Sequence, residues 1–195
     1  KKNNSNKYSN EKAVSFTGSK KYSGDSFLAN SAAMRSGTKI LKQIIPSSLF
    51  EILSKNIECI DHPVEDNNKG YLTTDSYNKI KSILLWSDCL MLGSGLDDKK
   101  ESIDLTSKIL RNYSGKCVID AGGFLPIINN SLKIKDIPKK SILTPHYGEF
   151  SKILKISTDE LANNTINILD KFSKKLADSI LILKGPNTII MNGSG

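Results

Sequence analysis

A turn that carries both an imidazole and a carboxylate is found at residues 144–149, TPHYGE. Pro145 restricts the backbone before His146, and Glu149 follows three residues later. Imidazole and carboxylate groups bind polar ligands and transfer protons. Because packing alone seldom requires this combination, we interpret His146 as part of a functional site. The other histidine, His62, lies in an irregular stretch and is expected at the surface.

Two glycine-containing segments could hold an anion. Gly93-Ser94-Gly95-Leu96 lies between an apolar run and a helical one, where glycines admit a ligand and helical N–H groups bind anions. Lys184-Gly185 follows another apolar run and could place an ammonium beside a phosphate. A plain tight turn explains the first segment equally well, and an exposed lysine explains the second, so both interpretations stay open.

Two nucleotide-binding motifs are excluded. Asp98 replaces the third glycine of a GxGxxG fingerprint, which argues against a dinucleotide-type Rossmann site. No GxxxxGK[ST] run is present, which excludes a P-loop NTPase.

Asp120 ends a further apolar run and is open to two interpretations. Its carboxylate can bind a ligand or cation, or it can accept hydrogen bonds from the backbone of the following turn. The three cysteines, Cys59, Cys89 and Cys117, are far apart in apolar segments, which predicts buried thiols in a reducing compartment. With two histidines and no CxxC pair, the sequence predicts no metal site made by the protein.

The elements that would position these residues alternate between short apolar runs and helical periodicity. Strands are predicted at 13–17, 89–92, 117–120, 141–144 and 180–183, and helices at 24–35, 47–55, 74–86, 98–112 and 158–177. This alternation predicts a mainly parallel α/β sheet, and uninterrupted apolar strands such as 89–92 predict burial on both sheet faces. Ligands of such sheets bind beyond the carboxyl ends of the strands. Because each segment discussed above falls at such an end, we expect them to lie together.

A single domain is predicted at residues 13–195, after a polar tail or linker at 1–12. Residues 188–191 are spaced as the second arm of a hairpin, and Asn192-Gly193 is a turn signal that requires another strand. The domain is therefore expected to continue beyond Gly195.

The formal charge of +8 is explained by lysines on solvated helix faces, with a basic cleft for phosphorylated ligands as the alternative. Because the lysines are spread over the whole chain, no nucleic-acid partner is expected. No membrane partner is expected either, since no apolar run approaches the ~18 residues that a membrane span needs.

Several of these segments, in the same order, resemble one family, the ADP- or ATP-dependent NAD(P)H-hydrate dehydratases. The similar segments are 18–37 (GS…RSG), 93–96 (GSGL for GPGL), 118–122 (VIDAG for LDA), 142–150 (ILTPHYGEF for LTPHPGEF) and 183–190 (LKGPNTII for LKGxxTVI). The resemblance covers nearly the whole chain, and the turn at 142–150 is its most specific part. It implies a ribokinase-like three-layer α/β fold with a mainly parallel central sheet, incomplete at its C-terminal part.

The resemblance also implies an activity in metabolite repair: nucleotide-dependent dehydration of hydrated NADH or NADPH, by phosphorylation of the added hydroxyl and loss of phosphate. It implies that Asp25, Gly95 and His146 contact the hydrate. The site for ADP or ATP, with Mg²⁺, would be lined by Lys184, Gly185, Pro186, Asn187 and Thr188. A cytoplasmic homo-oligomer with a possible epimerase domain or partner is expected.

Two departures from the family pattern qualify these expectations. Gly24-Asp25-Ser26 stands where the family has Gly-Ala-Ala, so the loop over the substrate is more polar and acidic. The family's G-x-G-D segment, whose Asp activates the hydroxyl, is expected beyond Gly195, so no catalytic residue is assigned and these residues alone are expected to be inactive. Two rival functions stay open: another ribokinase-fold kinase of small alcohols, and a catalytically inactive nucleotide-binding module.

Overall fold

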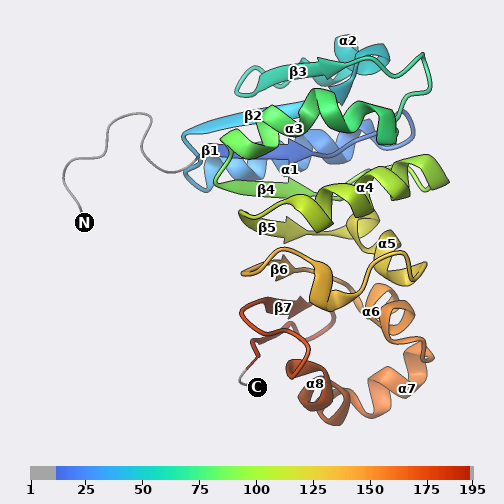
Figure 1. The fold of residues 1–195 in the computed structure, drawn as a ribbon. Coiled ribbons are helices and arrows are strands. Elements are labelled where there is room, and N and C mark those ends of the chain that lie inside the picture. The colour runs from blue at the N-terminus through green and yellow to red at the C-terminus, as the bar shows by residue number, and fades with distance from the viewer. Residues whose placement is uncertain (1–11, 194–195) are drawn as a thin grey trace.

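The computed structural model describes residues 12–193, which form one eight-stranded sheet in the order β3-β2-β1-β4-β5-β6-β7-β8 (Figure 1). The strands are β1 Lys12–Phe16, β2 Ile40–Pro46, β3 Ile60–Val64, β4 Cys89–Leu92, β5 Lys116–Ile119, β6 Ile142–Leu143, β7 Ile180–Leu183 and β8 Ile189–Met191. Each pair of neighbours is parallel except β7 and β8, which form an antiparallel hairpin. The predicted mainly parallel sheet is confirmed. Of the predicted tail at 1–12, Lys12 opens β1 and the other residues lie outside the described part.

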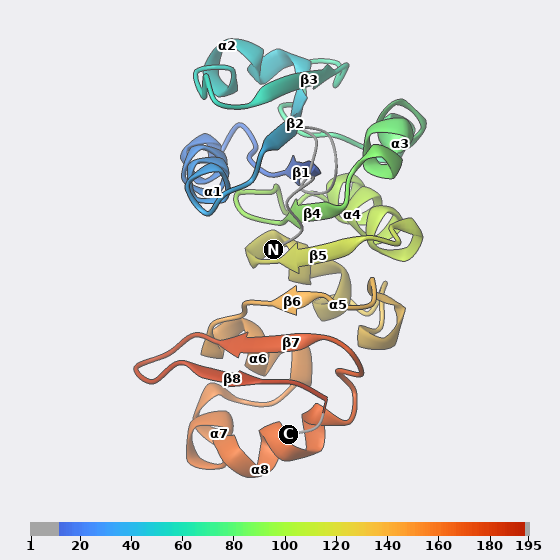
Figure 2. The ribbon, with the colours of Figure 1, turned by 90° about the vertical axis from the view of Figure 1, so that its left-hand side faces the viewer.

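Helices connect the strands and cover the sheet unequally. They are α1 Ser23–Arg35, α2 Phe50–Leu53, α3 Tyr77–Trp86, α4 Lys100–Asn112, α5 Leu125–Ile128, α6 Tyr147–Leu154, α7 Thr158–Asn163 and α8 Thr165–Ser173. Short 3-10 turns precede α2, α3 and α5, and one more spans Ile134–Asp136. Helix α1 lies on one face of the sheet, and α3 and α4 lie on the opposite face (Figure 2).

Burial alternates along the central strands. Residues 90 and 92 of β4, 117 and 119 of β5, and 181 and 183 of β7 are almost fully buried in the main hydrophobic core. Their neighbours on the other face, including Met91, Val118 and Ile182, are only half-buried. Because no helix of residues 12–193 covers that face over β4–β7, the prediction of strands buried on both faces is wrong for the described part of the chain.

Strands β2 and β3 have no counterpart among the predicted elements. The segment of β3 contains Pro63, which lacks a backbone donor, and β3 lies at the edge of the sheet, where this is tolerated. His62 consequently lies in a strand, half-buried and paired in register with Ile44. The prediction that His62 lies in an irregular surface stretch is therefore wrong.

The predicted helix at 158–177 is two helices. Asn164, between α7 and α8, has non-helical angles of φ −128° and ψ 24°. The Thr165 hydroxyl donates to the Leu161 carbonyl over 2.8 Å. Asn and Thr side chains compete for backbone hydrogen bonds, which explains the break at this point.

The cysteine prediction is confirmed for Cys117, which is buried, while Cys59 and Cys89 are half-buried. All three are free thiols. Burial raises the pKa of each, that of Cys59 to about 11 with help from the nearby charges of Asp61 and Glu58. A high thiol pKa makes these residues poor nucleophiles at neutral pH.

Helix α1 is attached to the sheet by polar contacts. Its buried residues are Ser26 and Asn30. The Ser26 hydroxyl lies 2.9 Å from that of Thr17, and the Asn30 amide donates to Gln43 over 2.7 Å. These bonds link α1 to the end of β1 and to β2, and so determine where the first turn of α1, with Asp25, lies.

A buried carboxylate fixes the loop that follows β3. Asp66 is 4% exposed and accepts hydrogen bonds from the backbone of Ser48 and Gly70 and from the hydroxyls of Ser47 and Ser48. The Gly70 carbonyl in turn accepts from the backbone N–H of Lys20 over 3.1 Å. Asp66 therefore stabilises the segment between β1 and α1 indirectly, through Gly70.

Substitution Asp66→Ala is expected to lower the free energy of unfolding by about 2 kcal/mol, because it removes four hydrogen bonds and leaves the buried Gly70 N–H unpaired. The exposed Asp178→Ala is the control and should change it by about 0.5 kcal/mol at most. Urea denaturation measures both. Equal losses for the two variants would contradict the buried network.

Acid sensitivity provides a second readout. Burial of Asp66 disfavours its ionised form, but the hydrogen bonds from Ser48, Gly70 and Ser47 outweigh this and lower its pKa below 3.8. The ionised carboxylate thus contributes stability above its ordinary pKa, and this contribution is lost as the pH falls through the lowered value. In Asp66→Asn this part of the acid dependence should be absent.

Candidate active site

The ladder of the sheet continues past the strand ends into the loops that carry the candidate residues. Backbone N–H groups donate to carbonyls of the adjacent strand or loop: Asp120 to Leu92 (3.0 Å), Thr144 to Ile119 (3.1 Å), Lys184 to Pro145 (2.8 Å) and Gly18 to Ser94 (2.8 Å). These loops are therefore held in register along one edge of the sheet.

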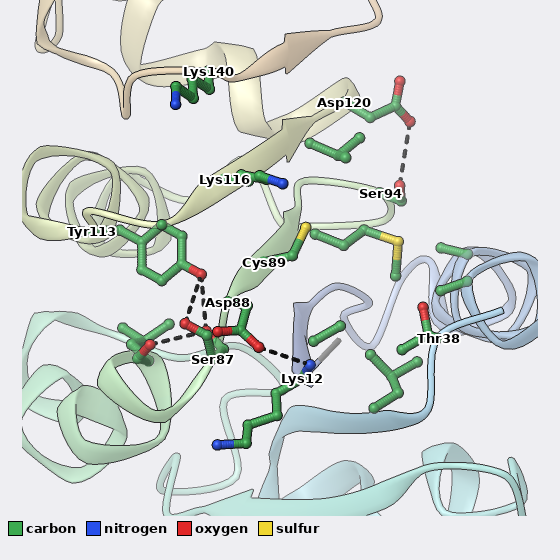
Figure 3. Close-up of a pocket in the computed structure, with 18 of the residues that line it drawn as sticks. Lys12, Thr38, Ser87, Asp88, Cys89, Ser94, Tyr113, Lys116, Asp120 and Lys140 are labelled. Carbon is green, nitrogen blue, oxygen red and sulfur yellow. Dashed lines mark hydrogen bonds between the residues drawn. The ribbon is translucent and has the colours of Figure 1, made fainter. Parts of the chain in front are cut away.

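The carboxylate of Asp120 lies at the centre of this edge. Its Oδ1 accepts from the Lys184 ammonium and from the Thr144 hydroxyl, each over 2.8 Å. Its Oδ2 accepts from the Ser94 hydroxyl over 3.2 Å, as Figure 3 shows. Burial disfavours the ionised form, yet these donors, Lys184 first, lower the pKa of Asp120 below 3.8. Asp120 is thus an ionised group that joins loops from four strands.

His146 is the N-cap of α6. Its Nδ1 accepts from the backbone N–H groups of Gly148 (3.0 Å) and Glu149 (3.3 Å). Glu149 completes a capping box, because its Oε2 accepts from the His146 backbone over 2.9 Å. Since Nδ1 accepts, we assign the ring proton to Nε2. The imidazole is 60% exposed, and its Nε2 lies 3.6 Å from Oε2 of Glu149, beyond hydrogen-bond distance.

Gly95 and Asp25 lie against each other. Gly95 has φ +69°, and a Cβ at this position would come within 2.5 Å of the Tyr22 carbonyl oxygen and 2.8 Å of the Asp25 Cβ. Asp25 itself is exposed in the first turn of α1. The loop after β4 and the start of α1 therefore meet through the backbone of a glycine.

Residues 184–188 connect β7 to β8 and are exposed. Lys184 forms an isolated parallel bridge with His146, so the loop begins beside the capping turn. A Cβ on Gly185 would lie 2.6 Å from Cε2 of Tyr147, which shows that this glycine packs on the first residue of α6. The predicted hydrate residue His146 and the predicted nucleotide residues are thus neighbours.

A groove runs from this edge over the open face of the sheet. Ser94 and Asp120 lie at one end, and Lys12 and Asp88 lie at the other (Figure 3). Met91, Val118, Thr144 and Lys184 also line it. Of the predicted site residues only Lys184 lines this groove; Asp25, Gly95 and His146 lie outside it. The structure thus brings the predicted site residues together in two groups. Asp25 lies with Gly95, and His146 lies with residues 184–188. Their roles toward ligands remain predictions.

Two residues of this edge, Ser94 and Thr144, were given no role of their own from the sequence, although both lie in segments that it singled out, 93–96 and 144–149. Asp120 was a candidate because it follows a strand. Their convergence depends on the order of strands β4, β5 and β6 in space, which the sequence does not display.

The family model described as NAD(P)H-hydrate dehydratase matches residues 14–195. The chain belongs to this family. Curated relatives include a bifunctional NAD(P)H-hydrate repair enzyme of Dictyoglomus turgidum, 27% identical over 186 residues, which cover 93% of this chain and 35% of that protein. An ADP-dependent (S)-NAD(P)H-hydrate dehydratase of Nitrosopumilus maritimus is 28% identical over 181 residues, or 91% of this chain and 60% of that one. The chain thus spans about a third to three-fifths of these relatives.

Solved structures confirm the ribokinase-like fold. A ribokinase-like superfamily protein of Enterococcus faecalis superposes with a TM-score of 0.78 at 18% identity, covering 98% of this chain and 63% of that one. The ADP/ATP-dependent NAD(P)H-hydrate dehydratase of Bacillus subtilis gives a TM-score of 0.73 at 20% identity, covering 100% and 65%. At this identity the likeness is one of fold.

Two absences concern residues 12–193. In this part of the chain no group of three or more His, Cys, Asp or Glu side chains is placed to hold a metal ion. Among the same residues, none of the helices combines the length and apolar character needed to cross a bilayer.

Substitution Gly95→Ala is expected to destabilise the protein by about 1–3 kcal/mol, because a methyl group at φ +69° is strained and collides with Tyr22 and Asp25. Gly24→Ala is the matched control: no atom lies within 4 Å of its added Cβ, and stability should rise slightly or stay unchanged. Urea denaturation of both variants measures the difference. If Gly95→Ala is as stable as Gly24→Ala, the close contact does not exist.

Proposed function

We propose that this protein restores NADH or NADPH from the hydrated cofactor at the expense of ADP or ATP. The observation that carries the proposal is the bridge between His146 and Lys184, which sets the turn expected to hold the hydrate beside the loop expected to hold the nucleotide. Membership of the NAD(P)H-hydrate dehydratase family supports it, as do the activities for which the Dictyoglomus and Nitrosopumilus relatives are named.

The chemistry would proceed in two steps. The hydroxyl oxygen of the hydrate takes the terminal phosphoryl group as the phosphoanhydride bond breaks, releasing the hydroxyl proton and a nucleotide one phosphate shorter. The C–O bond then breaks to release inorganic phosphate, and loss of a proton from the neighbouring carbon restores the double bond of the reduced ring. Phosphoryl transfer depends mainly on positioning and charge stabilisation. Lys184 supplies positive charge, and the Nε2–H of His146 is a donor that can orient the hydrate. No catalytic base is assigned among residues 12–193.

Residues 184–188 fit a nucleotide better than they fit a bare metal ion. They combine an ammonium, a glycine and exposed backbone, which suit phosphate oxygens. Asp120, the nearby carboxylate, already accepts from three side chains. Mg²⁺ would therefore be held chiefly by the nucleotide phosphates, as is usual for this ion, and would neutralise charge on them.

The biological setting stays a prediction. We expect a cytoplasmic protein, which the three free thiols support, and a homo-oligomer, whose mass light scattering would measure. The bifunctional relatives support an epimerase domain or partner for this protein as well.

The full-length product of the gene tests the function directly. With hydrated NADH, Mg²⁺ and either ADP or ATP, the absorbance of NADH should recover with time, and omission of the nucleotide should prevent this. Nucleotide consumption with small alcohols but not with the hydrate would favour a small-alcohol kinase. Nucleotide binding without turnover of any substrate would favour an inactive binding module.

His146 substitutions separate its two expected roles. His146→Ala removes the cap of α6. It should lower the free energy of unfolding by about 1 kcal/mol and should also abolish turnover. His146→Asn retains a capping side chain but no ring donor, so it should keep the stability and still lose turnover. His62→Ala, which changes the other histidine, is the control for activity. Normal turnover by His146→Asn would remove the imidazole from the site.

A further inference from the structure

The Asp120 carboxylate contacts one side chain from each of three segments to which a ligand role is expected, those of Gly95, His146 and residues 184–188. Ser94 directly precedes Gly95, Thr144 lies two residues before His146, and Lys184 begins the nucleotide loop. Each contact is long-range in sequence, because the partners are 26, 24 and 64 positions apart. Turn formation after β5 would not require any of these contacts.

Asp120 also restricts the lysine that it holds. The Lys184 side chain is 46% exposed and the Asp120 side chain 29%. A free lysine at this exposure would sample many rotamers, and fixing it at the moment of binding costs side-chain entropy. Because two hydroxyls and the adjacent ladder hold Asp120 in place, its bond to the ammonium restricts Lys184 before a ligand arrives. The other two N–H donors of the ammonium remain available for phosphate oxygens.

The geometry points to Asp120 as a positioning residue for phosphoryl transfer that acts through Lys184. It links the part of the site expected to hold the hydrate to the part expected to hold the nucleotide. This inference rests on the proposed function. Asp120 touches neither substrate: it fixes the Lys184 ammonium where the two substrates must meet, and it ties that position to the turns of Gly95 and His146 through Ser94 and Thr144.

Two direct roles for Asp120 are less consistent with its surroundings. A general base must accept a proton from substrate, but both carboxylate oxygens are already engaged by donors that stabilise the ionised form. A metal ligand would use the same two oxygens, and the Lys184 ammonium, 2.8 Å from Oδ1, would repel a cation bound there.

A double-mutant cycle in the full-length protein tests the inference. Asp120→Asn is nearly isosteric, and its amide oxygen can still accept from a hydroxyl, so folding should be retained; thermal unfolding checks this. It should lower kcat about 10- to 100-fold and change KM for the hydrate less. In a Lys184→Met background, Asp120→Asn should add little, because the residue through which it acts is already absent. Asp178 is an exposed carboxylate away from this edge, so the control variant Asp178→Asn should retain full activity.

Three results would overturn the positioning role. Independent, multiplicative losses in the double variant would show that Asp120 does not act through Lys184. Wild-type kcat in Asp120→Asn would show that it does not act at all. A much larger loss of turnover in Asp120→Asn than in Lys184→Met would show direct participation of Asp120 in the chemistry.

The same cycle measured by calorimetry with ADP separates this inference from the proposed function. If wild-type protein fails to dehydrate hydrated NADH, the proposed function falls, while ADP affinity still reports on the pair. Asp120→Asn should then weaken ADP binding about tenfold in the wild-type background and little in Lys184→Met. Equal weakening in both backgrounds, or no ADP binding by the wild type, would overturn the inference as well.

Discussion

Five strands at the centre of the sheet, β1 and β4–β7, are neighbours and run parallel, so their carboxyl ends lie along a single edge. The backbone hydrogen bonds between them continue for one or two residues beyond the strands. This extended ladder is the constraint on which the candidate site depends. Polar groups on rigid strand ends need little reorganisation when a ligand binds, which is what phosphoryl transfer requires.

Two residues of this edge combine a structural hydrogen bond with a proposed role in the chemistry. His146 caps α6 with one ring nitrogen and thereby directs the proton of the other outward. Asp120 accepts hydrogen bonds from two hydroxyls and an ammonium, which would otherwise lie close together without a shared acceptor. In both cases the structural bond determines which atom remains for a ligand. Stability and activity therefore change together in simple alanine variants, and conservative variants are needed to separate them.

Much of this arrangement could be predicted from the sequence, because it depends on local patterns. Short apolar runs ended by Gly, Asp or Lys located the central strands, and TPHYGE located the capping turn. The edge strand β3 was missed because Pro63 is unfavourable in most strands and is accepted here only by position. The break at Asn164 was missed because apolar periodicity continues across it.

The polar convergence on Asp120 could not be predicted for a different reason. Its partners are separated from it by tens of residues, and nothing in their spacing indicates a contact. The order of strands in the sheet brings them together, and that order depends on the whole core. The half-open face over β4–β7 could not be predicted either. The apolar sequences of these strands are the same as those of strands covered on both sides, and only the positions of the helices show that one face is open.

Gly93 has a consequence for how this sequence can vary. A Cβ there would lie 1.8 Å from the Asp120 carbonyl oxygen and 2.6 Å from the Gly123 nitrogen, atoms of the main chain that cannot rotate away. The loops after β4 and β5 thus exclude every side chain at this position, whatever its chemistry. Gly24, with open space around it, carries no such restriction. Random mutagenesis should therefore recover functional variants at position 24 and almost none at position 93, so glycine content alone is a poor guide to which loops can be altered.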